Sequence, residues 1–223
     1  MDDRASDDEA SGATVAGCIA AFAPGVSTLH RTDVLQSLLL AQLAANAKAE
    51  RHKSPSPWFN AYRGVMEQTA WVVEGSVAAA RYLPGIARFS VGNVVNDIFR
   101  NKLAPEELAC VMATVNAVKS DVKGLSQLVF ECPSHSGGIG NFQIALATQD
   151  DDGTLNLAIA QISFNAPQHV TRLMTEEFTS TAQFQTGFLF LTQNESVYAT
   201  LRDAIARKVE SRFAGSVALL QLA

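Results

Sequence analysis

The stretch that decides the fold is residues 141–149, Asn-Phe-Gln-Ile-Ala-Leu-Ala-Thr-Gln, where large apolar side chains alternate with polar or small ones. Successive side chains of a strand point to opposite faces, so this period of two is typical of a strand with one buried face. Asp152-Gly153 follows, a dipeptide favoured in tight hairpin turns. The pattern therefore predicts a β-hairpin whose second strand covers residues 155–164.

Beyond this hairpin the chain continues with strand-like segments, and the spacing of its apolar residues then becomes helical. Residues 170–178 and 183–192 are expected to form strands, and residues 125–132 a strand before the hairpin. Residues 196–213 carry an apolar residue at every fourth position, namely Val197, Leu201, Ile205, Val209 and Phe213. This spacing predicts an amphipathic helix, and residues 217–222 are expected to add a final strand.

The first half of the chain has helical spacing instead. Four helices are expected, beginning near Asp33 as N-cap, at Ser56-Pro57, near residue 91 and at Pro105. A helical block followed by strands defines an α+β fold. We expect residues 1–14 to be a disordered acidic N-terminus and residues 15–223 to form one domain. Its helical part runs to about 123 and its sheet part starts from about 125. The helices should pack, mainly on one face, on a five- or six-stranded, mainly antiparallel sheet, with a late amphipathic helix and a final strand.

Composition narrows the classes of function. The net charge is −5 at pH 7, and only 17% of residues are charged. A phosphate-binding surface needs a basic face, so nucleic acid is not an expected partner. No apolar run reaches the roughly 18 residues of a transmembrane helix. Val15-Ala16-Gly17-Cys18 fits a bacterial lipoprotein cleavage box, but an acidic stretch precedes it. The expected location is therefore cytoplasmic, or secreted without a classical signal peptide.

The cysteines and histidines suggest one enzyme hypothesis. Three widely spaced cysteines do not resemble a disulfide framework. Cys132 and His135 lie three residues apart beside the Gly-rich segment 134–140, which makes them candidates for a thiol–imidazole pair in a small hydrolase. The histidines lack the spacing of a metal site, so neither a metal nor a cofactor is expected. Cys18 and Cys132 are also candidates for acylation.

Basic residues on the last helix suggest a binding surface. Arg202, Arg207, Lys208 and Arg212 decorate a helix whose apolar stripe faces the core. Four cations on one exposed face favour anionic headgroups or an acidic protein partner.

In outline, the order of helices, amphipathic strands, helix and final strand resembles some small bacterial virulence and cytolytic toxin proteins, which also lack signal peptides. No motif matches residue by residue, so the resemblance assigns no functional residue. The leading hypothesis is a non-enzymatic interaction protein with a membrane-surface or virulence role and an unknown protein or lipid partner. Two alternatives remain open. One is a carrier of an apolar small ligand or lipid in a cleft between sheet and helices, and the other is the Cys132/His135 hydrolase.

Overall fold

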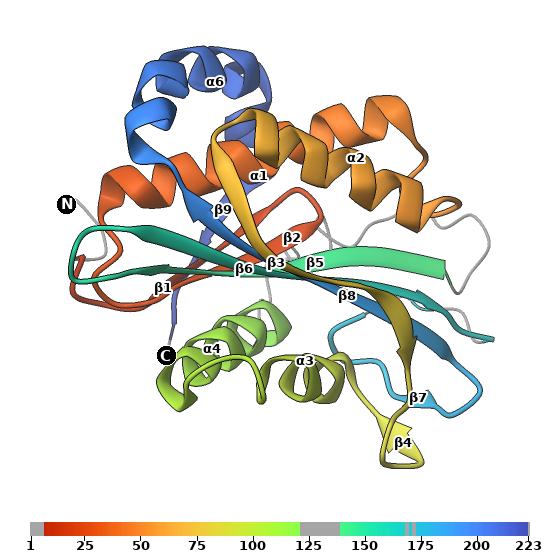
Figure 1. Cartoon of the computed structure of the whole chain (residues 1–223). Helices are drawn as coiled ribbons and strands as arrows, with labels where there is room; N and C mark the ends of the chain where they lie inside the picture. The colour runs from red at the N-terminus through yellow and green to blue at the C-terminus, as the bar shows by residue number, and fades with distance from the viewer. Residues whose placement is uncertain (1–6, 121–138, 168–169, 171–172, 223) are drawn as a thin grey trace.

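The hairpin predicted from residues 141–149 forms the middle of the sheet (Figure 1). The computed structural model describes residues 7–120, 139–167, 170 and 173–222. Strand β5 (Ile139–Gln149) pairs antiparallel with β6 (Leu155–Asn165). Gly153, at φ +86°, forms the turn between them, where a left-handed backbone suits glycine.

Seven strands form the main sheet, in the order β3-β8-β6-β5-β2-β1-β9. The other five are β1 (Ser11–Val15), β2 (Cys18–Phe22), β3 (Trp71–Tyr82), β8 (Gln183–Gln193) and β9 (Val217–Leu220). Every neighbouring pair is antiparallel except β2 and β5, which are parallel. A separate two-stranded sheet joins β4 (Arg88–Phe89) to β7 (Phe178–Thr179). The α+β class, the late helix and the final strand are confirmed, and the main sheet has seven strands rather than five or six.

Helices cover both faces of the sheet, and not mainly one as expected (Figure 1). On one face lie α1 (Thr28–Lys48) and α2 (Pro55–Gln68), with α6 (Glu195–Ser216) packed against the outside of α1. On the other face lie α3 (Val91–Phe99) and α4 (Pro105–Ser120). Each face buries its own hydrophobic cluster, so the sheet is a shared wall between two cores.

Strand β3 corrects the prediction for the second helix. Helical spacing through Val73 predicts a helix that ends before Pro84, but α2 ends at Gln68 and the chain turns at Ala70, at φ +65°. Valine at successive positions favours a strand once a partner is available, and β3 pairs with β8 along most of its length.

The N-terminal expectations also change. Part of the range predicted to be disordered, residues 11–14, belongs to β1, which is held between β2 and β9. Helix α1 begins before Asp33, with Ser27 as N-cap, and the Ser27 Oγ accepts a hydrogen bond from the His30 N–H at 3.2 Å. Asp33 therefore lies inside the helix.

Two expected strands have other outcomes. The range 125–132 lies outside the described residues. Of the residues described within 170–178, only Phe178 lies in a strand. Among the described residues, no helix has both the length and the apolar character needed to cross a membrane.

Candidate functional site

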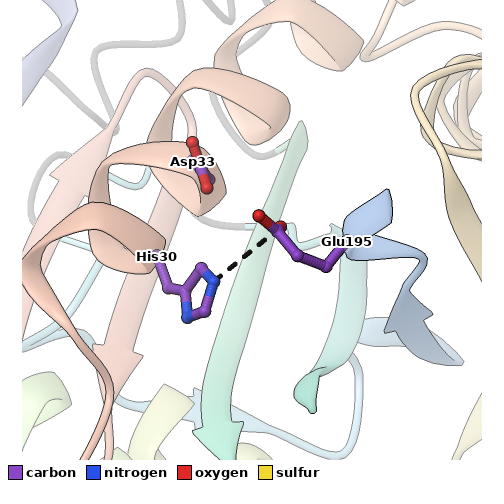
Figure 2. A group of neighbouring side chains, drawn as sticks. All are labelled: His30, Asp33 and Glu195. Carbon is purple, nitrogen blue, oxygen red and sulfur yellow. Dashed lines mark ion pairs between the residues drawn. The ribbon is translucent and has the colours of Figure 1, made fainter. Parts of the chain in front are cut away.

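Three side chains that could ligate a metal lie together where α6 meets α1. His30 and Asp33 come from α1 and Glu195 from the start of α6, and one potential ligand atom from each lies within 4.8 Å of the others (Figure 2). The Nε2 atom of His30 is 3.8 Å from the Oε2 atom of Glu195. Asp33 is only 1% exposed, so its charge needs a partner inside the fold.

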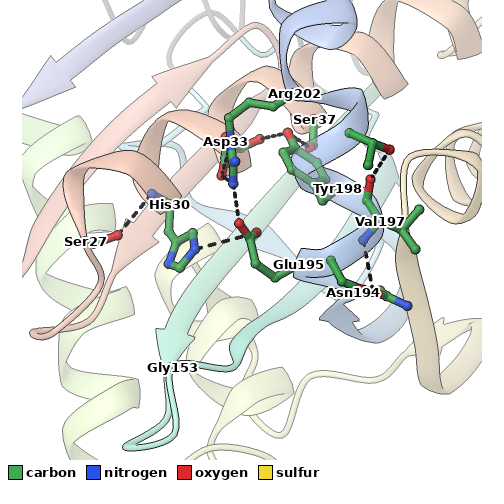
Figure 3. A network of polar contacts seen from close by, with 12 residues as sticks. Ser27, His30, Asp33, Ser37, Gly153, Asn194, Glu195, Val197, Tyr198 and Arg202 are labelled. Atoms are coloured by element: carbon green, nitrogen blue, oxygen red, sulfur yellow. Dashed lines mark hydrogen bonds and ion pairs between the residues drawn. The ribbon is translucent and has the colours of Figure 1, made fainter.

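That partner is Arg202, one of the cations singled out in the sequence (Figure 3). Its Nε donates to Oδ1 of Asp33 at 2.9 Å, and its Nη2 donates to Oδ2 at 2.9 Å. The same Nη2 donates to Glu195 Oε1 at 2.7 Å. Both Asp33 oxygens and one Glu195 oxygen already accept hydrogen bonds from this guanidinium. A metal ion would have to displace Arg202, so the group is better described as a partly buried ion-pair clamp between two helices.

A hydroxyl relay extends the clamp to the sheet. The Tyr198 hydroxyl donates to the backbone oxygen of Asp33 at 3.0 Å and lies 2.9 Å from Ser37 Oγ. The indole Nε1 of Trp71 donates to the same Ser37 oxygen at 3.1 Å. Ser37 can therefore donate to Tyr198 while it accepts from Trp71. The relay connects α6, α1 and β3 through fully buried groups.

The electrostatics of the clamp follow from its burial. Removal from water raises the pKa of the Asp33 carboxyl, and the hydrogen bonds from Arg202 oppose this shift only in part. Conversely, the bonds to Asp33 raise the pKa of Arg202. Burial also raises the pKa of the Tyr198 phenol. The phenol therefore stays neutral, which suits its role as a donor to a backbone carbonyl.

The other predicted cations have different surroundings. Arg207, Lys208 and Arg212 are exposed on α6, while Arg202 is held by Asp33 and Glu195. The structure thus separates one residue of the predicted basic face from the other three. Asp33 was missed as a site residue because an aspartate with a glutamine three positions later also fits a helix N-terminus.

The described cysteines lie in the core. Cys18 is 0% exposed and Cys110 is 6% exposed. Burial raises the pKa of Cys18 to about 12 and that of Cys110 to about 11, so both thiols are protonated at neutral pH. Acylation of Cys18 would require the β1–β2 hairpin to open. Cys132 and His135, the candidate catalytic pair, lie outside the described residues.

The apparent lipoprotein box, residues 15–18, is the turn of the β1–β2 hairpin. Its Gly17 N–H donates to Gln42 Oε1 at 2.9 Å, and its Gly17 carbonyl accepts from Arg51 Nη2 at 2.8 Å. A Cβ at Gly17 would lie 2.2 Å from the Arg51 Nη1 atom. The glycine of the box is therefore explained by the close approach of Arg51.

Comparison with known proteins gives structural neighbours alone. No protein-family model matches the chain, and no curated protein matches it in sequence. The activated Cyt2Ba monomer from Bacillus thuringiensis subsp. israelensis superposes with a TM-score of 0.51 and 11% identity, covering 78% of this chain and 96% of that chain. A delta-endotoxin gives 0.50 and 10%, covering 78% and 79%. The Evf virulence factor gives 0.40 and 13%, covering 91% and 84%, a likeness too low to support an argument. At these identities the first two matches show a shared fold.

Proposed function

We propose that this protein is a non-enzymatic, toxin- or virulence-type protein that acts at an anionic membrane surface through the outer face of α6. The observation that carries the proposal is the exposure of Arg207, Lys208 and Arg212 on a helix at the periphery of the fold. The fold shared with a delta-endotoxin supports the toxin-type class.

The packing of α6 directs these cations outward. Its buried residues are Tyr198, Ile205 and Val209. Tyr198 bonds to α1, and Val209 belongs to the core cluster on that face of the sheet. Within the described part of the chain, none of the three exposed cations forms an ion pair with a carboxylate. Asp203, Glu210 and Glu195 are exposed carboxylates of the same helix. Glu195 is paired with Arg202, so the three cations outnumber the two remaining carboxylates by one.

The expected binding is weak and salt-sensitive. A basic residue near an anionic membrane contributes about 1 kcal/mol, so three could contribute about 3 kcal/mol before the opposing carboxylates are counted. The net charge of −5 repels the membrane at long range. Screening over about 8 Å at physiological salt leaves the nearest charges dominant.

Flotation with vesicles tests the proposal. Wild-type protein should float with vesicles of phosphatidylserine and phosphatidylcholine at low salt, and not with phosphatidylcholine alone. The double variant Arg207→Glu/Lys208→Glu should lose flotation, because it replaces attraction with repulsion.

The matched control is Arg88→Glu/Lys119→Glu, which changes the net charge equally but acts at exposed positions away from α6. It should float like the wild type. Equal loss in both double variants would indicate a net-charge effect. Flotation unchanged by reversal at Arg207 and Lys208 would reject α6 as the docking surface.

A further inference from the structure

A cleft lies on the opposite side of the sheet from α6, beneath the connection between α3 and α4. Its volume is about 450 Å³, within the range of roughly 300–1,000 Å³ typical of small-molecule sites. Four strands form its floor, and residues of the connection and of the start of α4 form its wall. The residues that line the cleft include Glu74, Gly75, Lys102, Glu107, Leu146, Thr148, Asp150, Asn156, Ala158, Phe190 and Thr192.

The floor is divided into an apolar and a polar row. Strand register places Leu146, Ala158 and Phe190 side by side across β5, β6 and β8. The next row, two residues along on the same face, contains Thr148, Asn156 and Thr192. Phe190 is 36% exposed, although its neighbours in the core are buried. A ligand on this floor therefore meets hydrocarbon on one side and hydrogen-bonding groups on the other.

The polar row ends in a carboxylate. The Thr192 hydroxyl donates to Asn156 Oδ1 at 2.9 Å, and Asn156 Nδ2 donates to Asp150 Oδ2 at 2.9 Å. This chain of bonds orients Asp150 at the mouth of the cleft. Glu74 lines it from the opposite edge, at a bulge in β3 where the register shifts between Val73 and Gly75.

The charge balance of the lining is negative. The lining contains three carboxylates, those of Glu74, Glu107 and Asp150, and one ammonium, that of Lys102. The Lys102 Nζ lies 5.2 Å from the centre of the Phe188 ring, which is 4.7 Å from that of Phe190. An aromatic ring face attracts cations, and the Phe188 ring already has the Lys102 ammonium over it. The exposed ring of Phe190 offers the same interaction to a ligand.

We propose that the cleft binds a small organic cation, an amine or quaternary ammonium compound with an aromatic or short alkyl body. Its charge lies toward Asp150, with Glu74 and Glu107 adding to the negative charge of the lining, and its body rests on Phe190 and Leu146. This site goes beyond the membrane role proposed above and is independent of it, because α6 lies on the other face of the sheet (Figure 1).

Three probes of similar shape test the charge preference. Titration calorimetry with benzyltrimethylammonium, benzyl alcohol and phenylacetate should give binding in that order, with phenylacetate weakest. Added salt should weaken the binding of the cation alone, because screening reduces attraction between opposite charges. Equal binding of the alcohol, or tighter binding of the anion, would overturn the proposal.

Variants locate the binding. A Cβ at Gly75 would meet only Phe190, at 3.8 Å, an ordinary van der Waals contact. Gly75→Leu should therefore place its side chain in the cleft and abolish binding. Ser76→Leu places the same side chain on an exposed position of the other face and should leave binding unchanged. Glu74→Gln/Asp150→Asn keeps the shape of the lining and should weaken binding of the cation by about tenfold. Undiminished binding to the Gly75→Leu protein would place the ligand elsewhere and reject this site.

Discussion

Asp33 relies on Arg202 in the clamp, because the guanidinium donates to both of its carboxyl oxygens. A buried ion pair contributes little net stability, since the cost of removing two charges from water offsets their attraction. Loss of one partner lowers the free energy of unfolding, because the other charge then stays away from water without a counter-charge. Arg202 keeps 23% of its side chain exposed, whereas Asp33 keeps 1%. The clamp should therefore tolerate neutralisation of Asp33 better than removal of Arg202.

The pH dependence of stability should report on Asp33. Burial raises its pKa in the folded state, so the folded protein binds this proton more readily than the unfolded chain. Its contribution to the free energy of unfolding is therefore present at low pH and decreases as pH rises from the ordinary carboxyl range through the raised folded value.

Asp33→Asn preserves the shape and removes the titration. Urea unfolding of both proteins from pH 3.5 to pH 7, about the range in which buried carboxyls titrate, should show the wild type losing stability relative to the variant as pH rises. A difference that grows in favour of the wild type would mean that Arg202 outweighs burial.

Among the helices and strands, the sequence predicted those with a periodic pattern of apolar residues. It missed those whose conformation depends on a neighbouring strand. The β5–β6 hairpin and helix α6 follow from alternation and four-residue spacing, and both are present. Strand β3 could not be recognised, because it is an edge strand with most side chains exposed and no buried face to produce alternation.

The site was predicted only in part, for a related reason. The basic residues of α6 are visible in the sequence, but the partner of Arg202 lies 169 residues away. Spacing along the chain contains no information on such a pair. The cleft residues likewise come from four strands and a helix connection, and only the register brings them together.

Helix α6 should depend on the hydroxyl of Tyr198. In Tyr198→Phe the Asp33 carbonyl loses its side-chain donor, although it keeps its bond within the helix. Ser37 loses an acceptor in the core, and the total cost is about 1–3 kcal/mol. Hydrogen exchange should accelerate in α6 before the rest of the fold. Tyr82→Phe is a matched control, since its hydroxyl bonds to Asp97 at 2.6 Å on the other side of the sheet. If both variants loosened α6 equally, the relay would not be what holds it.

For the whole molecule, the sheet mixes strands from both halves of the chain. Strands β1, β2 and β3 come from the first half, yet β3 pairs with β8 and β2 pairs with β5. Each of these early strands borders a late one, so neither half contains a complete sheet. From this arrangement we propose that the chain forms a single domain.

A fragment of residues 1–123 should therefore not fold. It would retain α1 and α2, but the side of the core supplied by β5, β6 and β8 would be missing, leaving apolar surface exposed to water. Circular dichroism should show a gradual thermal change without a cooperative transition. Cooperative unfolding of the fragment alone would contradict the one-domain assignment.

The pairing of β1 with β9, in which Gly12 lies opposite Leu220, has a consequence for biosynthesis. A ribosome delivers the β1–β2 hairpin early, but the strand that covers the outer edge of β1 is made some 200 residues later. At about 5–20 residues per second, that edge waits ten seconds or more for its partner. An open strand edge attracts other chains. The nascent protein should accordingly rely on chaperones during translation, and slower elongation should increase its aggregation.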